Sequence, residues 1–440
     1  MSEWIEKPLS ELAAIRVSNV DKKSHPSEYP VRLCNYMDVY SGLYLNDEAE
    51  YMEATASARE ISNFALQTGD VIITKDSESP DDIGIPAIID QTAGGLVCGY
   101  HLAILRPNRS KVDPLFLLKQ IESDAVRRYY LKRAAGSTRY ALATGTVEAT
   151  PIKVASLESQ RAISRILRAI DTQIEATEAL IAKQERVRAG LMQDLFTRGV
   201  DEHGQLRPPS EEAPNLYHQT ELGWLPKGWE APELECFLAP ISTPMRSGPF
   251  GSALLKHELV ASGIPFLGID NIHVEQFKSN FVRFVTPRKF AELFRYRVLP
   301  DDVVITIMGT VGRCCVIPNG FGEMLSSKHL WTMTFDQSKV LPELVCWQLN
   351  HAPWVLSRFR AKSQGGIMDA IQSSTLKKLR LPLPLMAEQT QILRIYREAT
   401  SHLQMMRDES SKLALEKSGL MQDLLTGKVS VAPLLECAAA

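Results

Sequence analysis

The sequence has no apolar run near the about 18 residues that a membrane span needs, and its start lacks a basic segment followed by an apolar core. Its seven cysteines are an odd number, with no Cys-x-x-Cys pair and no histidine at zinc-ligand spacing, so neither a disulfide framework nor a structural metal is indicated. The net charge of -3 supplies no broad field that would attract a polyanion. We therefore expect a cytoplasmic protein in which any nucleic-acid contact depends on local clusters of charge.

The motifs of several enzyme classes are also missing. The one Gly-Lys pair, Gly427-Lys428, is followed by Val429 and has no glycine five positions before it, which excludes a phosphate-binding loop of the Walker type. The Pro-Asp pairs at 80–81 and 300–301 would suit a metal-dependent nuclease, but no Glu-x-Lys follows them at a suitable distance. We interpret both pairs as turns. The sequence predicts no catalytic residue, no metal site and no cofactor in this chain.

What the sequence does contain is an internal repeat, and a repeat outweighs other signals because it fixes the architecture. Three pairs of segments carry it: Gly190-Leu-Met-Gln-Asp-Leu with Gly419-Leu-Met-Gln-Asp-Leu, Asp70-Val-Ile-Ile-Thr with Asp302-Val-Val-Ile-Thr, and His101-Leu with His329-Leu. Single residues such as Gln160 and Gln389 extend the match. The chain is therefore predicted to hold two diverged copies of one unit.

The copies divide into globular and helical parts. Short β-branched runs at 71–74 and 303–306 indicate buried strands, so we expect an α+β fold. A polar, proline-rich segment between the copies is typical of a linker. The predicted parts are a first globular domain at 1–155, a helical region at 156–200, a linker at 201–220, a second globular domain at 221–384, a second helical region at 385–430 and a tail at 431–440.

Each helical region carries apolar or small residues every seven positions, which favours two helices that pair along their length over helices that pack only on their own domains. Helices of this length span roughly 58 Å. The seam consists of Ile163, Ile170, Thr177, Gln184 and Leu191 beside Leu167, Ile174 and Ile181 in the first region, and of Ile392, Ala399, Met406, Leu413 and Leu420 beside Tyr396 and Leu403 in the second.

Positive charge is concentrated at equivalent places in the two copies. Nine Lys or Arg residues against three acids lie between Arg106 and Arg139, and six against one lie between Pro353 and Arg380. Two such runs favour phosphate contact, although a solvated surface has the same composition. Each run also holds a Gly/Ser/Thr/Gln patch, at 136–140 and 363–366, whose short side chains could reach base edges or form plain turns.

The sequence resembles the specificity subunits of type I restriction-modification enzymes over nearly its whole length. The segments that carry the resemblance are the two Gly-Leu-Met-Gln-Asp-Leu helix ends and the stretches 217–229, 247–256, 264–271 and 302–313. The resemblance implies two target-recognition domains, each reading one half of a split duplex DNA site, separated by an antiparallel helix pair. It also implies docking of two modification subunits, which methylate adenine with S-adenosylmethionine, and through them of restriction subunits, which translocate and cleave DNA with ATP and Mg²⁺.

Carried onto this chain residue by residue, the resemblance and the two patches give candidate contacts. The DNA-contact candidates of the second domain are Arg246, Ser247, Gly248, Phe250, Gly251, Ser252, Lys256, Asn271, Thr310, Arg313, Lys328, His329, Gln364 and Gly365. The first domain lacks the Gly-Pro-Phe-Gly-Ser loop and has an acidic stretch at 76–82, which leaves Lys75, His101, Ser137, Thr138, Arg139 and Tyr140. Candidates for helix pairing and partner docking are Ile163, Ile170, Ile174, Leu191, Ile392, Leu403, Met406 and Leu420.

Two other functions remain open on the sequence alone. One is a helical scaffold that gathers partners without reading DNA. The other is a DNA methyltransferase or nuclease fused into one chain, which the missing motifs disfavour.

Overall fold

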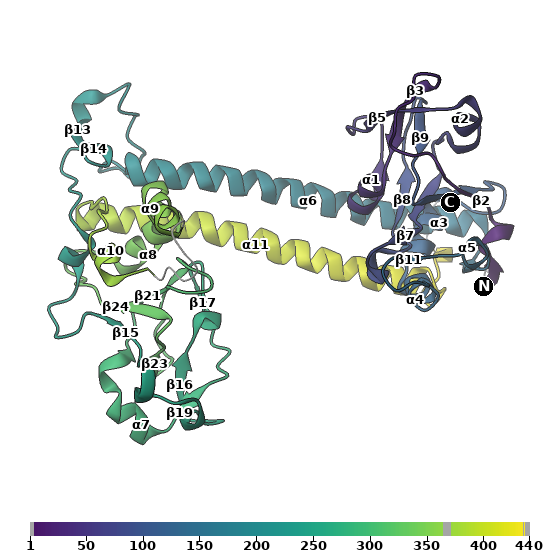
Figure 1. Cartoon of the computed structure of the whole chain (residues 1–440). Coiled ribbons are helices and arrows are strands. Elements are labelled where there is room, and N and C mark those ends of the chain that lie inside the picture. Colours follow the sequence, from purple (N-terminus) through teal and green to yellow (C-terminus); the bar gives the residue numbers. More distant parts are fainter. Residues whose placement is uncertain (1–3, 364–370, 434, 436–440) are drawn as a thin grey trace. The chain divides into compact units, whose positions relative to one another are not determined.

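The computed structural model describes residues 4–363, 371–433 and 435. The chain forms two compact units (Figure 1), of which unit 1 consists of residues 1–180 and 406–440 and unit 2 of residues 181–405. Each unit therefore combines one globular domain with a part of both long helices. Among the helices in the described ranges, none has the length and apolar character that a bilayer crossing requires.

Unit 1 is built on two main sheets. The first has the strand order β2 (Ala13–Val17), β10 (Leu102–Pro107), β6 (Val71–Thr74), β8 (Pro86–Ile89) and β4 (Tyr44–Leu45). The second has the order β5 (Met52–Ala56), β3 (Tyr29–Cys34) and β9 (Leu96–Cys98), and two ribbons pair β1 (Ile5–Pro8) with β12 (Pro151–Val154) and β7 (Asp76–Ser77) with β11 (Tyr140–Ala141). All residues of β6 and β8 are buried, as expected for unbroken apolar runs at the centre of a sheet.

Unit 2 repeats this plan. One sheet has the order β15 (Met245–Ser247), β24 (Leu330–Met333), β21 (Val303–Thr306) and β22 (Cys314–Val316), and the other has the order β19 (Phe284–Val285), β16 (Ile264–Leu267), β23 (Met324–Ser326) and β20 (Arg297–Val298). Two ribbons pair β13 (Tyr217–Thr220) with β14 (Gly223–Pro226) and β17 (Ile272–His273) with β18 (Gln276–Phe277). Both units contain a parallel strand pair next to an antiparallel neighbour, β3 with β9 and β16 with β23, and unit 1 also pairs β4 with β8 in parallel. The repeat and the α+β class predicted from sequence are confirmed.

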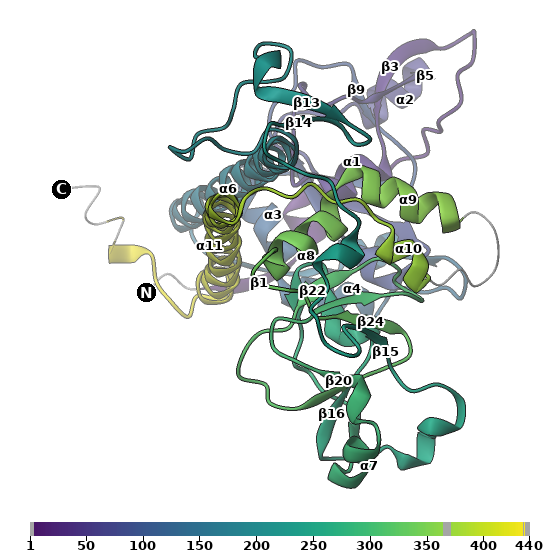
Figure 2. The same ribbon diagram turned by 90° about the vertical axis from the view of Figure 1, so that its left-hand side faces the viewer.

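Short helices cover these sheets. They are α1 (Tyr36–Ser41), α2 (Ala58–Phe64), α3 (Pro114–Glu122), α4 (Asp124–Leu131) and α5 (Thr144–Glu148) in unit 1, and α7 (Pro287–Glu292), α8 (Pro342–His351), α9 (Pro353–Ser363) and α10 (Ser373–Lys377) in unit 2. The equivalent helices α3 and α8 both start on proline, which suits the first helical turn because its N–H would be unpaired there. Figure 2 shows α8 between the β22–β24 sheet and the start of the second long helix.

The two long helices are α6 (Leu157–Thr197) and α11 (Met386–Leu424). In unit 1, Lys417 of α11 pairs with Asp171 of α6 at 2.8 Å, while Leu424 packs with Ile163 near the start of α6. In unit 2, Arg188 donates to Thr400 at 3.0 Å, and Glu388 accepts the backbone N–H of Val200, which follows α6. Within each unit the partner positions run in opposite directions, so the helices pair antiparallel.

The predicted seam faces inward. Ile163, Ile170, Ile392, Leu403 and Met406 are buried, and Ile174, Leu191 and Leu420 are half-buried. The ends of the helices also pack on the globular domains, since Ile163 belongs to the main core of unit 1 and Ile392 to that of unit 2. Both sequence interpretations of the helices therefore apply, each to a different part of the helix.

Two equivalent glutamines fix the starts of the long helices. The side-chain oxygen of Gln160 accepts the N–H of Asp113, and its amide donates to the carbonyl of Ala155, both at 2.9 Å. In unit 2, Gln389 accepts from Leu341 at 2.9 Å and donates to the carbonyl of Pro384 at 3.0 Å. Buried amides require such partners. The sequence match between these residues thus preserves one structural role.

The surfaces by which α3 and α8 meet the helix pair differ in chemistry. On α3, Lys119 is fully buried, with its ammonium 2.6 Å from both Asp171 and Glu122, and Lys417 bridges the same two carboxylates. At the equivalent position of α8, Trp347 is buried with its ring 4.1 Å from Phe196 and 4.8 Å from Tyr396. At this one position, unit 1 contacts its helices through ion pairs and unit 2 through aromatic packing.

Candidate nucleic-acid interface

The candidate contacts come from loops that leave the same strands in both units. The loop after β6 is fixed by a hydrogen bond from the N–H of Lys75 to the carbonyl of His101, at 2.8 Å. The loop after β21 makes the equivalent bond from Ile307 to His329, at 3.0 Å. The two histidines that the sequence paired therefore lie at the same place in the two copies, beside the loop that differs most in sequence.

In unit 1 the candidates gather around an acid. Asp76 accepts a hydrogen bond from Nε of Arg139 at 3.0 Å and lies 2.9 Å from its Nη2 in an ion pair. It also pairs with Nδ1 of His101 and lies 3.8 Å from the ammonium of Lys75. Pairing of β7 with β11 places Tyr140 opposite Ser77. Four predicted residues, Lys75, His101, Arg139 and Tyr140, are thus brought together across the sheet ribbon.

Ser137 and Thr138 are exposed on the bend that precedes β11. Their side chains share this surface with Arg139, whose side chain is 54% exposed.

His101 is neutral at neutral pH in this environment. Burial lowers its pKa, Asp76 acts in the opposite direction, and the charge of Arg139 lowers it further, so that the pKa falls below its usual value. Its backbone has a φ of 72°, a conformation that non-glycine residues adopt rarely and often at functional sites. The ring lies 3.7 Å from that of Tyr100. A neutral ring nitrogen can accept a hydrogen bond from Arg139, whose Nη2 is 2.8 Å from Nε2.

Replacing Gly136 by alanine should displace the bend that carries Arg139. A Cβ atom there would lie 1.9 Å from the carbonyl oxygen of Arg139, and its φ of +146° is strained for other residues. We expect a loss of roughly 1–3 kcal/mol of stability or a relocated bend, and weaker binding of specific DNA. Thermal unfolding and DNA titration measure both effects. Gly145→Ala is the control, because its Cβ meets nothing within 4 Å; equal effects of the two changes would contradict the prediction.

In unit 2, the loop after β15 is packed against the segment between β23 and β24. Gly248 has no room for a side chain, since a Cβ would lie 2.1 Å from the carbonyl oxygen of Ser326. The hydroxyl of Ser247 donates to the carbonyl of Lys328 at 3.3 Å. Beyond this contact Phe250 is 59% exposed. The start of the Gly-Pro-Phe-Gly-Ser loop is thus held on the 326–328 segment, and the loop presents an exposed aromatic ring.

The loop between β21 and β22 is closed on Thr306. The carbonyl of Thr306 accepts the N–H of Gly312 at 2.8 Å, and its hydroxyl accepts the N–H of Arg313 at 3.1 Å. Gly309 and Gly312 both have positive φ, which permits this tight return. Within the described residues, the hydroxyls of Thr310 and Ser327 have no hydrogen-bond partner. Polar groups of this kind usually find one, so they are candidates for contact with a ligand.

Besides Ser247 and Gly248, which are buried in the contact described above, two further candidates of unit 2 have their side chains inside the fold. Arg246 is 6% exposed; it pairs with the buried Asp302 and donates to the hydroxyl of Thr334 at 2.8 Å. Asn271 is 1% exposed and accepts the N–H of Gly268 at 3.0 Å. We interpret both as supports of the loops rather than as groups that reach DNA.

The other candidates of unit 2 lie at or near the surface. Exposed are Phe250, Gly251, Ser252, Lys256 and Lys328, and half-buried are Thr310, Arg313 and His329. Burial lowers the pKa of His329, and the charges of Lys328 and Arg283 lower it further. Gln364 and Gly365 lie outside the described residues.

The basic runs are only partly available for phosphate. Arg106 holds the buried Asp70 with two hydrogen bonds, of 2.8 and 2.7 Å, and Lys119 is interior. In unit 2, Arg380 pairs with Glu221 at 2.9 Å. The charge counted along the sequence therefore exceeds the charge presented on the surface, where the members of the runs are Arg109, Lys111, Arg127, Arg128, Lys132, Arg133 and Arg139 in unit 1 and Arg358, Arg360 and Lys378 in unit 2.

Sequence reasoning missed two residues at these sites. Asp76 was seen only as part of an acidic stretch that put contacts in doubt, whereas it holds the cluster of unit 1 together. Arg283 lies in a segment without a motif, yet it pairs with Asp270 and influences His329. The available signal was Asp270 itself, which belongs to the 264–271 stretch that carries the family resemblance.

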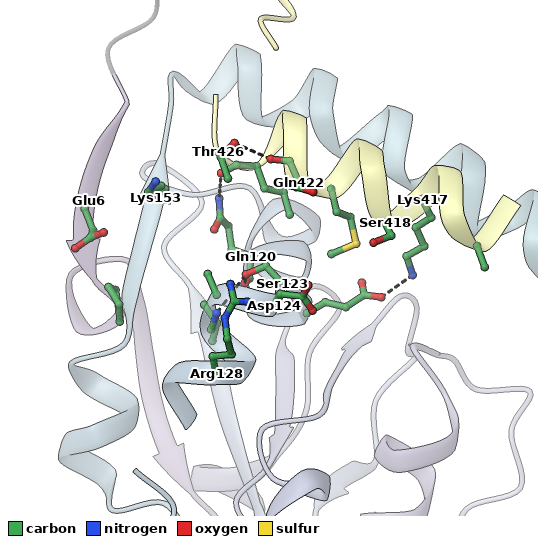
Figure 3. A pocket seen from close by; sticks show the side chains of 17 residues that line it. Glu6, Gln120, Ser123, Asp124, Arg128, Lys153, Lys417, Ser418, Gln422 and Thr426 are labelled. Carbon is green, nitrogen blue, oxygen red and sulfur yellow. Dashed lines mark hydrogen bonds and ion pairs between the residues drawn. The ribbon is translucent and has the colours of Figure 1, made fainter. Parts of the chain in front are cut away.

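A cavity of about 640 Å³ in unit 1 lies between α4, the β1–β12 ribbon and the end of α11 (Figure 3). Gln120 donates to the carbonyl of Leu425 at 3.1 Å on one side, and Lys417 pairs with Glu122 on another. Its labelled charges, Glu6 and Asp124 with Arg128 and Lys153, are of both signs. Such a lining does not match a polyanion. Across the described ranges, no three His, Cys, Asp or Glu side chains are grouped as a metal site needs.

Several known proteins are similar to this chain. Residues 1–186 match the family model described as type I restriction modification DNA specificity domain. A protein of Methanocaldococcus jannaschii that carries the name type I restriction enzyme MjaX specificity subunit is 25% identical over 84% of this chain and 81% of its own. The MjaVIII specificity subunit of the same organism is 22% identical over 64% of this chain and 62% of its own.

A solved structure has the same fold. The S subunit of a type I restriction-modification system from M. genitalium aligns with a TM-score of 0.56 at 14% identity, over 96% of both chains. The duplicated α+β fold with paired long helices is thus shared with this S subunit. In sequence, the chain is similar to the specificity subunits of type I restriction-modification systems.

Proposed function

We propose that each unit reads one half of a bipartite duplex DNA target. The observation that carries the proposal is the repeated bond between Lys75 and His101 in unit 1 and between Ile307 and His329 in unit 2. This bond supports the view that the two units hold their candidate loops in the same backbone arrangement. The side chains in that arrangement differ, with Asp76 and Arg139 in one copy and Thr310 and Arg313 in the other. The same backbone arrangement with different side chains suits two different half-sites, because base identity is read by side-chain donors and acceptors.

The chain on this proposal supplies specificity and no chemistry. Two modification subunits dock on it and methylate adenine with S-adenosylmethionine, and restriction subunits use ATP and Mg²⁺. The seam residues are occupied by helix pairing, so docking falls on other helix faces. Exposed apolar side chains there are Leu180, Val187, Met405 and Leu415. This replaces the seam residues themselves as the proposed docking contacts. The complex acts in the cytoplasm, on duplex DNA.

One inserted base pair tests whether the helices set the half-site spacing. In the assembled methyltransferase complex, the target is first found by sequencing methylated adenines in exposed DNA. Adding one pair between the half-sites rotates one of them by roughly 35° relative to the other, so we expect methylation to fall at least about 10-fold. A spacer of unchanged length and altered sequence is the control.

The outcomes separate the open functions. Methylation that tolerates the inserted pair would exclude a fixed spacing. A complex that binds all duplexes equally would favour the scaffold, and methylation by the isolated chain would favour the fused enzyme.

A further inference from the structure

The guanidinium of Arg139 is held in one orientation although the side chain is at the surface. Its Nε donates to one carboxylate oxygen of Asp76, Nη2 lies 2.9 Å from the same oxygen in an ion pair, and Nη2 is also within 2.9 Å of both ring nitrogens of His101. Among the described residues, none bonds to Nη1. The side chain is 54% exposed, whereas that of Asp76 is only 12% exposed. One edge of the guanidinium is therefore fixed by the protein, and the edge that contains Nη1 faces outward.

The charges around Arg139 oppose a phosphate contact. The adjoining segment carries four carboxylates, Asp76, Glu78, Asp81 and Asp82, against Lys75. A DNA phosphate bound to Arg139 would lie close to the carboxylate of Asp76, and repulsion between the two anions would weaken the contact. A base edge is uncharged, so it carries no such penalty.

The base that best fits the outward-facing N–H groups of Arg139 is guanine. In the major groove guanine presents two acceptors, O6 and N7, and the two N–H groups of Nη1 can donate to both of them. Holding the guanidinium beforehand reduces the side-chain entropy lost on binding and favours the base that accepts two bonds at that angle. Adenine presents a donor in place of O6 and would face an arginine N–H with its own N–H.

We propose that Arg139 reads a guanine in the half-site of unit 1, and that Asp76 and His101 are positioning residues that orient it. The proposal rests on the proposed function, because it specifies what one side chain does when unit 1 reads DNA. It extends that function by naming the base and by assigning a role to the acidic stretch. Arg133 is a suitable comparison, since it is exposed in the same basic run but stacks on Tyr129 at 3.8 Å and, within the described part of the chain, pairs with no acid.

The test uses the assembled methyltransferase complex on duplexes that contain its mapped target. Each guanine of the half-site is replaced in turn by 7-deazaguanine, which lacks the N7 acceptor. At one guanine we expect this replacement to lower kcat/KM of the wild-type complex roughly 10- to 100-fold. The Arg139→Ala complex should show an equally large loss of kcat/KM on unmodified DNA. The same 7-deazaguanine should hardly change kcat/KM of the Arg139→Ala complex, whereas it should lower kcat/KM of the Arg133→Ala complex as much as that of the wild type.

Asp76→Asn separates orientation from charge. Removing the carboxylate should strengthen binding of non-target DNA, because repulsion falls, and at the same time weaken discrimination at the one guanine. The exposed Asp81 provides the matched change, Asp81→Asn, which alters charge alone and should leave discrimination intact. A purely structural role of Asp76 would lower binding to all DNA together.

Two results would overturn the inference and leave the proposed function standing. The first is an Arg139→Ala complex that binds every sequence more weakly by one factor, with a salt dependence reduced by about one phosphate contact. The second is an Arg139→Ala complex with unchanged discrimination at every guanine. By contrast, a wild-type complex without any sequence preference would remove the proposed function itself. Thermal unfolding of each variant checks that the loss does not come from misfolding.

Discussion

Replacing Asp171 by alanine should destabilise unit 1 by about 3–5 kcal/mol, because the change leaves Lys119 buried with a single remaining carboxylate partner. The substitution also removes one of the two carboxylates that hold Lys417 of α11. Hydrogen exchange of the full chain measures the effect peptide by peptide. Protection should fall in α3 and in the last part of α11, where the network is anchored.

The pH dependence of this network follows from its pKa shifts. Burial alone would raise the pKa of Asp171, but Lys119 and Lys417 outweigh it and hold the pKa below its usual value. Its contribution to stability is therefore present above the unfolded pKa of about 3.9 and is lost as pH falls through the lower folded value. Burial would lower the pKa of Lys417, but Glu122 and Asp171 raise it. Its contribution is complete below about 10.4 and is lost as pH rises through the raised folded value.

Glu178→Ala is the matched control, because Glu178 is an exposed acid on the same helix. We expect it to change stability by less than about 0.5 kcal/mol. If Asp171→Ala behaves like this control, the ion pairs do not stabilise unit 1.

Trp347→Ala should destabilise unit 2 by about 3–5 kcal/mol, because the indole fills the contact of α8 with Phe196 and Tyr396. Its ring N–H has no hydrogen-bond partner among the described residues, so the loss is one of packing alone. This effect should not depend on pH, since no charged group is removed, whereas the effect of Asp171→Ala should shrink as pH falls below about 3.9. Thermal unfolding at several pH values measures the difference.

The exposed Trp224 of β14 provides the comparison, Trp224→Ala, for which a small change is expected. A small loss of stability for Trp347→Ala would mean that the surrounding helices repack and fill the cavity left by the indole. A loss that varies with pH would show that charged groups of unit 2 depend on the indole for their positions.

The sequence did not predict that Lys119 is buried in ion pairs and Trp347 in aromatic contacts, even though the repeat aligns the two positions. A lysine in a helix next to a glutamine predicts an exposed face, since lysine is rarely buried unless it is paired. Its partner Asp171, and Lys417, which pairs with the same carboxylate, are far away in the chain, and only folding brings them to α3. The sequence also did not show the role of Arg246. The family resemblance placed it among the DNA contacts, but in the fold it forms an ion pair with Asp302.

The sequence by itself determined the duplication, the α+β class, the two long helices and the side of each helix that faces the other. These features are encoded in local periodicity and in recurring segments, which act over a few turns or strands. Tertiary structure alone decided which charges are interior and which are presented. Asp76 and Arg139 are 63 positions apart, and the ribbon of β7 and β11 brings them into contact. Ion pairs of that kind depend on geometry and burial, and no spacing along the chain specifies either.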